Sequence, residues 1–156
     1  MSETDQDVGV FCIRYTHRPE VIGVTRVERE VVDVHDDNLI YDGPREGDDK
    51  DTHEIHMQFP KDVTAFYILN YSASGEGQSY FDSKSMSIYA SFVEVMQVVA
   101  GFYAEDHQYD EDCEVCTDEG SRVCHRRAMA TFRRKHRLHY IGSESCSLSY
   151  RKVRVQ

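Results

Sequence analysis

The sequence predicts an all-β fold, a β-sandwich with acidic loops at one end and little helix. Short alternating or continuous apolar runs recur along the chain, and breaks rich in glycine, proline and serine separate them. Only one segment has the apolar spacing of a helix. A chain of 156 residues suits one domain with one core. We expect residues 1–156 to form that domain, with residues 1–7 as a disordered start.

The first half of the chain contains four strand-like segments. Residues 8–15 are apolar on both alternating sides, which predicts a buried strand. Residues 21–34 are rich in valine and predict one long strand or two short ones. Residues 53–59 alternate cleanly between apolar and polar, as a half-buried strand does, and Pro60 ends them. Residues 63–71 are almost continuously apolar and predict a central strand.

The second half is harder to assign. Its first segment shows both helical spacing and serine alternation, and the serines and β-branched residues favour strands at 85–95 and 97–104. Residues 105–121 predict an acidic linker. Residues 122–141 are basic, and residues 147–155 predict a last strand.

Charge is spread unevenly along the chain. The formal net charge is −10, which argues against the protein as a whole coating nucleic acid or an anionic membrane. Residues 120–156 nevertheless hold ten Lys and Arg and a single acid, Glu144. This basic segment can interact with the acidic remainder of the chain or bind an anionic partner.

The first residues and the cysteines bear on the cellular compartment. MSETDQDV is acidic and polar, unlike a secretory signal, and no apolar window is long enough for a transmembrane segment. Five cysteines without such a signal indicate free or metal-bound thiols in a reducing interior. We therefore expect a cytoplasmic protein.

Residues 36–60 concentrate oxygen-bearing side chains on a segment interrupted by glycine and proline. Calcium takes six to eight oxygen ligands and tolerates irregular geometry, so these side chains are candidate calcium ligands. They are Asp37, Asn38, Asp42, Glu46, Asp48, Asp49 and Asp51. The alternative is a solvated acidic loop, which composition alone favours.

A second candidate metal site lies in the pattern Cys113-x2-Cys116-x7-Cys124-His125. The C-x-x-C turn can present two thiolates to one Zn²⁺ ion, and Cys124 with either His125 or His107 completes four ligands. The pattern lacks a second C-x-x-C, so unpaired surface thiols remain the alternative.

The basic segment is a candidate anion-binding surface through Arg133, Arg134, Lys135 and Arg137. The alternative is a charged strand pair that faces solvent or the acidic loops, and the net negative charge favours it. No nucleophile, base and orienting group fall in a recognisable catalytic context, which indicates a non-enzymatic protein.

Three stretches together resemble the TerD family, the calcium-binding stress proteins of tellurite-resistance clusters. They are HDDNLIYDGPREGDD, EIHMQFPKDVTAFYILNY and GQSYFDSKSMSIYASF, and they span roughly residues 35–92. The matching elements, in the family's order, are Asp37–Asn38, Gly47–Asp48–Asp49, Pro60, Asp62–Val63, Gly77–Gln78 and Phe81. Asp36 stands where the family has Gly, and Lys50 stands where it has Glu.

The resemblance implies a β-sandwich whose acidic loops bind calcium. It also implies a non-enzymatic role in stress response through protein partners, including a complex at the inner face of a membrane. The alternative function is a zinc-containing adaptor whose basic C-terminal segment binds nucleic acid or another anion.

The calcium hypothesis predicts that calcium raises the melting temperature and that magnesium does so less. The ion would bind only the ordered loop, and magnesium demands stricter octahedral geometry. Thermal melting with each ion checks this, and calorimetry on a variant carrying Asp48→Asn and Asp49→Asn is the control. A melting curve unchanged at millimolar calcium would contradict the hypothesis.

Overall fold

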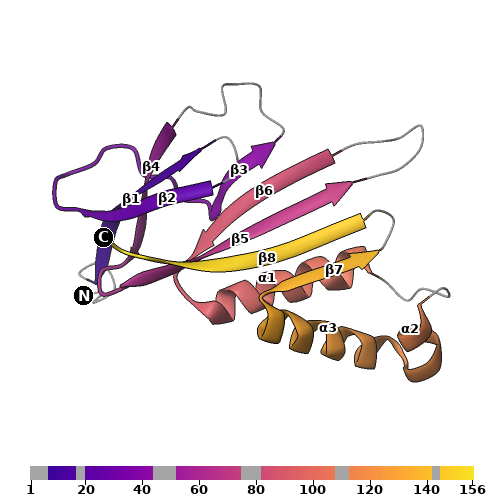
Figure 1. Ribbon diagram of the computed structural model, residues 1–156. Helices are drawn as coiled ribbons and strands as arrows, with labels where there is room; N and C mark the ends of the chain where they lie inside the picture. The colour runs from indigo at the N-terminus through magenta and orange to yellow at the C-terminus, as the bar shows by residue number, and fades with distance from the viewer. Residues whose placement is uncertain (1–6, 17–19, 44–51, 75–81, 108–112, 142–144) are drawn as a thin grey trace.

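The computed structural model describes residues 7–16, 20–43, 52–74, 82–107, 113–141 and 145–156, which form two antiparallel sheets and three helices (Figure 1). The three-stranded sheet has the order β2-β1-β4, with β1 Val8–Thr16, β2 Glu20–Val27 and β4 Thr52–Pro60. The five-stranded sheet has the order β3-β6-β5-β8-β7, with β3 Leu39–Gly43, β5 Ala65–Ser74, β6 Asp82–Tyr89, β7 Arg137–Ile141 and β8 Ser145–Arg154. The helices are α1 Phe92–Asp106, α2 Glu114–Glu119 and α3 Ser121–Lys135.

An aromatic cluster joins the two sheets. The ring centroid of Phe66 on β5 lies 5.1 Å from that of Phe11 on β1 and 4.6 Å from that of Phe59 on β4, all edge to face. Phe11 and Phe66 are fully buried, and Ile68 of β5 belongs to the same core. Burial of these apolar side chains holds the three-stranded sheet against one end of the larger one.

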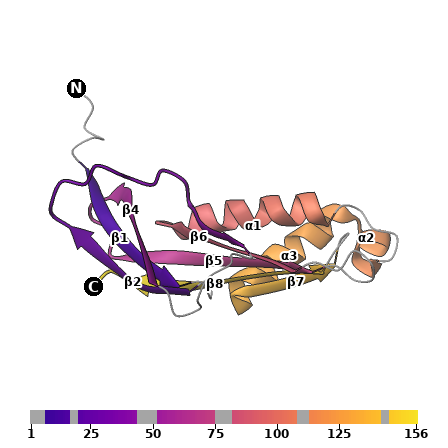
Figure 2. The same ribbon diagram turned by 90° about the horizontal axis from the view of Figure 1, so that it is seen from above.

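The helices cover the opposite face of the five-stranded sheet. Successive strand residues point to opposite faces, so Tyr67, Leu69 and Tyr71 of β5 point away from the aromatic cluster. Leu69 belongs to a second core with α1 and α3, and the ring of Tyr71 stacks on Phe102 of α1 at 4.7 Å. Figures 1 and 2 show the helices at one end of the sheet and the three-stranded sheet at the other.

The β-rich prediction is confirmed, and the prediction of little helix is wrong. The expected strands at 8–15, 53–59, 63–71 and 147–155 correspond to β1, β4, β5 and β8. Of residues 21–34, only the first part is strand, as β2, and the acidic segment contains the additional short strand β3. Helices form the second layer at one end of the five-stranded sheet, so a sandwich does not describe that end. At the other end, where the two sheets meet, the β-sandwich stays a prediction.

Helix α1 occupies the expected strand at 97–104 and also the end of the expected strand at 85–95, which β6 forms only as far as Tyr89. Ser91 caps it, since its Oγ accepts a hydrogen bond from the backbone N–H of Glu94 at 3.2 Å. Val95 and Val99, four residues apart, are fully buried against the sheet. This i, i+4 burial outweighs the strand preference of the valines because it places the apolar stripe on the core.

The expected acidic linker and the basic strand pair are also mostly helical. Residues 113–119 contain α2, and residues 121–135 form α3 before the chain enters β7. The side chains that α3 buries recur at helical spacing and are Cys124, Ala128, Met129 and Phe132. The many charges between them lie on the exposed side, which hides the helical pattern in the sequence.

None of the described helices is long and apolar enough to cross a membrane.

Two valines of α1 test the helix directly. In a strand, residues 93 and 95 would share a face, whereas in α1 Val93 is 65% exposed and Val95 is fully buried. We expect Val95→Ala to lower the free energy of unfolding by roughly 2 kcal/mol, from two lost methyl groups and a cavity. Val93→Ala should be neutral, because alanine is the better helix former. Urea unfolding measures both, and equal losses would contradict the helix.

Candidate metal centre

Four side chains converge where the three helices meet. They are His107, Cys113, Cys116 and Cys124, and their ligand atoms all lie within 4.8 Å of one another. The sulfurs of Cys113 and Cys124 are 3.8 Å apart. His107 Nε2 lies 3.7 Å from the Cys116 sulfur and 3.6 Å from the Cys124 sulfur. Three soft sulfur donors and one imidazole nitrogen therefore surround a common point.

These separations match a tetrahedral zinc site. Zn–S bonds of about 2.3 Å and Zn–N bonds of about 2.0–2.1 Å put sulfur pairs about 3.8 Å apart and sulfur–nitrogen pairs about 3.6 Å apart. Three of the six donor pairs lie at or near these values, and all six lie within 4.8 Å. Zn²⁺ with three Cys and one His is also a common structural combination. The four side chains thus have the spacing and the chemistry to hold such an ion.

Each helix contributes to the cluster through a specific position. His107 is the C-cap of α1, and its backbone N–H donates to the carbonyl of Tyr103 at 2.8 Å. Cys113 is the N-cap of α2, Cys116 lies within α2, and Cys124 lies in the first turns of α3. A bound ion would therefore join all three helices at one point.

The electrostatics of the cluster differ between two of its thiols. The backbone N–H of Cys116 lies beside the Cys113 sulfur and lowers the pKa of that thiol to about 7, with help from His107 and the neighbouring thiols. Burial raises the pKa of the Cys124 thiol to about 11. Cys113 thus reaches the thiolate form near neutral pH, whereas Cys124 needs a cation beside it to become a thiolate ligand.

Tyr103 supports the cluster from α1. Its hydroxyl lies 2.9 Å from the Cys124 sulfur, and it is buried. Its ring packs on the His107 imidazole, with centroids 4.9 Å apart. A hydroxyl within hydrogen-bond distance of a ligand sulfur and a ring packed on a ligand imidazole are typical of the groups that orient metal ligands. This role was not predictable from the sequence, because residues 97–104 have the composition of a strand.

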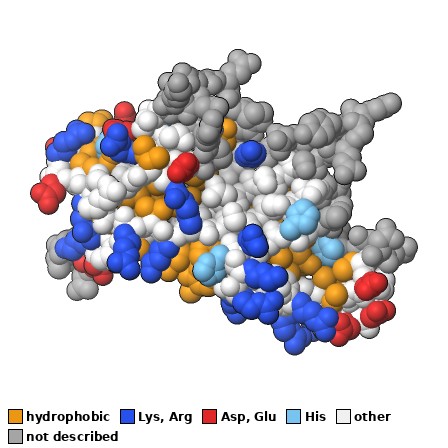
Figure 3. Space-filling model, in the orientation of Figure 1, with side chains coloured by type: hydrophobic (Ala, Val, Ile, Leu, Met, Phe, Trp, Pro, Cys, Tyr) orange, Lys and Arg blue, Asp and Glu red, His pale blue; other side chains and the backbone are white. Residues whose placement is uncertain are grey.

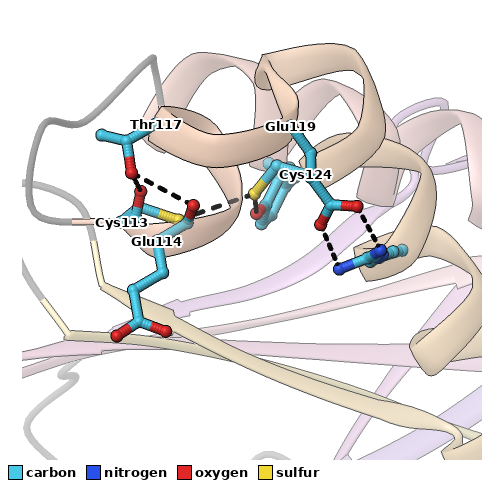
Figure 4. A network of polar contacts seen from close by, with 7 residues as sticks. Cys113, Glu114, Thr117, Glu119 and Cys124 are labelled. Carbon is cyan, nitrogen blue, oxygen red and sulfur yellow. Dashed lines mark hydrogen bonds and ion pairs between the residues drawn. The ribbon is translucent and has the colours of Figure 1, made fainter.

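Helices α2 and α3 are joined by a second contact beside the cluster (Figure 4). Both carboxylate oxygens of Glu119 contact the guanidinium of Arg127, at 2.6 and 2.7 Å. The Thr117 hydroxyl donates to the carbonyl of Cys113 at 3.0 Å within α2. The ion pair is exposed and is therefore worth little to stability, but it links α2 to α3 through two contacts.

A cavity of about 380 Å³ adjoins the cluster. The ligand side chains of His107 and Cys116 line it, as do Tyr103, Ser121 and Arg122. The cavity is open at one side, and this opening supplies the path that an ion needs to enter a site built from partly buried donors.

The fourth donor is His107 rather than His125. Both were candidates from spacing, and His125 directly follows Cys124 in the sequence. In α3, however, the Nε2 atom of His125 lies 3.3 Å from the carbonyl oxygen of Ala100 on α1. Adjacent helix residues project about 100° apart, and His125 is not among the four converging donors, although it lines the adjoining cavity. It instead joins α3 to α1 beside the cluster.

The predicted calcium ligands are only partly described. Asp37 Oδ1 accepts a hydrogen bond from the backbone N–H of Leu39 at 3.0 Å. Asn38 Nδ2 donates to the carbonyl of Ile88 at 2.7 Å, and Asp42 is exposed on β3. Glu46, Asp48, Asp49 and Asp51 lie outside the described residues. The calcium site therefore stays a prediction.

The predicted anion-binding residues lie together at one edge of the fold. Arg133, Arg134 and Lys135 form the last turn of α3, and Arg137 begins β7 two residues later. All four side chains are exposed. The strand pair expected for this segment is wrong, because α3 supplies three of the four residues.

No known protein family, curated protein or solved structure matches the chain. The geometry of the described residues is therefore the basis for assigning a function.

A pair of histidine variants identifies the fourth ligand. We expect His107→Ala to lower zinc affinity strongly, because it removes a donor, and His125→Ala to leave it nearly unchanged. Competition with a chromophoric zinc chelator measures both affinities. Equal affinities, or a larger loss in His125→Ala, would contradict the assignment.

Proposed function

We propose that this protein is a non-enzymatic binding module built on a structural zinc centre. Zn²⁺ would be held by His107, Cys113, Cys116 and Cys124, and the observation that carries the proposal is the convergence of these four donors within 4.8 Å of one another. Three thiolates and a neutral imidazole leave the centre with a net charge of −1. Four protein ligands fill the coordination of Zn²⁺ and leave no open position for a substrate, which is the arrangement of structural sites.

Helix α2 supports a structural role for the ion. It has only six residues, and isolated helices shorter than about 12–15 residues are marginal in water. Its one buried side chain is Cys116, a candidate ligand. Beyond Cys116, only Val115 of α2 and its N-cap Cys113 pack on the core, and both are partly exposed. The ion would thus supply most of the free energy that orders this helix.

The centre would also fix the basic end of α3. Cys124 lies nine residues before Arg133, a rise of about 13.5 Å along the helix. Holding Cys124 at the cluster and Phe132 in the core leaves the last turn rigid and exposed at the sheet edge. We infer that Arg133, Arg134, Lys135 and Arg137 bind an anionic partner from this position. Reduced thiols suit a reducing compartment such as the cytoplasm.

Metal content tests the proposal. Protein purified without added zinc should contain about one zinc ion per chain by elemental analysis. Cys116→Ser should lose it, whereas Cys12→Ser, which changes a buried cysteine outside the cluster, should keep it. Protons compete for thiolate ligands, so zinc should be released as the pH falls. Zinc-free wild type, or zinc retained by Cys116→Ser, would contradict the proposal.

A chelator should also lower the helical signal in circular dichroism, because α2 and the start of α3 depend on the ion. The signal of Cys116→Ser should resemble that of the chelated wild type. A helical signal that does not respond to metal removal would show that the ion, if bound, is not structural.

A further inference from the structure

One part of the five-stranded sheet is covered neither by the helices nor by the three-stranded sheet. In β5, Phe66 and Ile68 point toward the three-stranded sheet, and the next residues on that face are Asn70 and Ser72. Both are only partly buried. The face thus changes along one strand from an apolar core to an accessible polar surface.

Two rows of paired residues form this polar face. In the first, Ser72 lies opposite Lys84 of β6 on one side and Ser147 of β8 on the other. Ser147 in turn lies opposite His139 of β7, whose Nδ1 is 3.0 Å from the Ser147 hydroxyl. Paired residues in a sheet share a face, so this row runs from a lysine to a histidine across four strands.

The second row runs beside the first. Asn70 lies opposite Ser149 of β8, which lies opposite Arg137 of β7. The rows enclose a shallow cavity of about 180 Å³, lined by Asn70, Ser72 and Ser149 among others. Strand positions usually hold β-branched or aromatic residues, and serine and asparagine there add little packing. This face is therefore built for hydrogen bonding rather than for covering by an apolar layer.

The charge of the face points to an anionic partner. Lys84, Arg137 and His139 are exposed on it, and the two rows hold no acidic residue, although the protein carries a net charge of −10. The nearest acidic position on this face is Asp82, which pairs with Ser74 beyond the first row. Arg137 continues the basic last turn of α3 around the edge strand β7. Figure 3 shows this surface as an uncharged area flanked by Lys, Arg and His side chains. Basic residues in the last turn of α3 are also favoured by the negative end of the helix dipole. That effect does not account for Lys84, which lies on strand β6.

Nucleic acid fits this surface better than a membrane does. Basic membrane-binding surfaces also present apolar side chains to the bilayer. The one apolar residue paired into these rows, Met86 opposite Asn70, is fully buried in the core and presents nothing to a bilayer. The four strands place Lys84 about 14 Å from the β7 residues, a span that covers more than one phosphate of a nucleic-acid strand. Serine hydroxyls and an asparagine amide can bond sugars and base edges, which are accessible in single strands.

We propose that the rows Lys84–Ser72–Ser147–His139 and Asn70–Ser149–Arg137, continued by Arg133–Lys135, bind single-stranded nucleic acid. This inference rests on the proposed anion-binding function. It names single-stranded nucleic acid as the partner and the two rows as the surface along which the strand would lie. The phosphates would lie near the basic side chains at both edges, and the hydroxyl and amide groups would contact the strand between them. The two rows supply no aromatic ring for stacking, so binding is salt-sensitive and largely independent of sequence.

Fluorescence anisotropy with labelled single-stranded RNA and DNA of mixed sequence tests the proposal. Lys84→Glu should weaken binding several-fold and reduce the slope of log K against log salt by about 0.7, the loss of one phosphate contact. Lys61→Glu is the matched control, because Lys61 is an exposed lysine in the turn after β4 and the charge change is the same. A variant carrying Arg133→Glu and Arg134→Glu should also weaken binding.

The outcomes separate this inference from the proposed function. Equal effects of Lys84→Glu and Lys61→Glu, in variants with matching unfolding curves, would overturn the sheet face as the site. Binding lost only in the Arg133 and Arg134 variant would leave the anion-binding function standing without the face. Displacement of RNA by polyglutamate at equal charge concentration would overturn the choice of nucleic acid. Stronger binding of RNA than of DNA would indicate that the serine hydroxyls of the rows contact the ribose 2′-OH.

Discussion

The burial of strand β5 on both of its faces around Ile68 and Leu69 is the constraint on which the rest of the structure depends. Neighbouring residues in this strand belong to different cores, with Ile68 packed toward the three-stranded sheet and Leu69 packed toward the helices. Both side chains are essentially inaccessible to solvent. The strand is also hydrogen-bonded on both sides, to β6 and β8. Because alternating side chains must satisfy two layers at once, its register cannot shift by one residue without exposing both cores.

Much of the sheet was predictable from the sequence, because strand signals are local. The clean alternation in 53–59 and the continuous apolar run in 63–71 appear as β4 and β5. The helices were missed for physical reasons. Serine alternation before residue 91 led to a strand prediction, although Ser91 and Glu94 have the spacing of a helix capping box. In α3 the charged residues outnumber the four buried ones, so its apolar stripe becomes visible only when the core is known.

The candidate site was predictable in its ligand types but not in its full membership. The C-x-x-C pattern and Cys124 identify three donors, because short spacing in the sequence keeps such side chains close. The choice between His107 and His125 depends on where α1 ends and how α3 faces it, which the spacing does not contain. The contact of Tyr103 with Cys124 joins two helices, and the rows of serines join four strands. Because these segments lie far apart in the sequence, neither feature was predictable from it. The acidic residues 46–51 lie outside the described residues, so their hypothesis rests on sequence alone.

The small size of α2 has a consequence for the life of the protein in a cell. A six-residue helix with one buried side chain has almost no stability of its own. If the cluster holds an ion, loss of that ion would leave the backbone of α2 open to proteases. The three-stranded sheet and the core that it shares with β5 contain none of the four donors, so they would not depend on the ion. Degradation would then begin at a single point and would depend on metal occupancy more than on global unfolding. On the zinc proposal, the abundance of this protein would follow the supply of zinc.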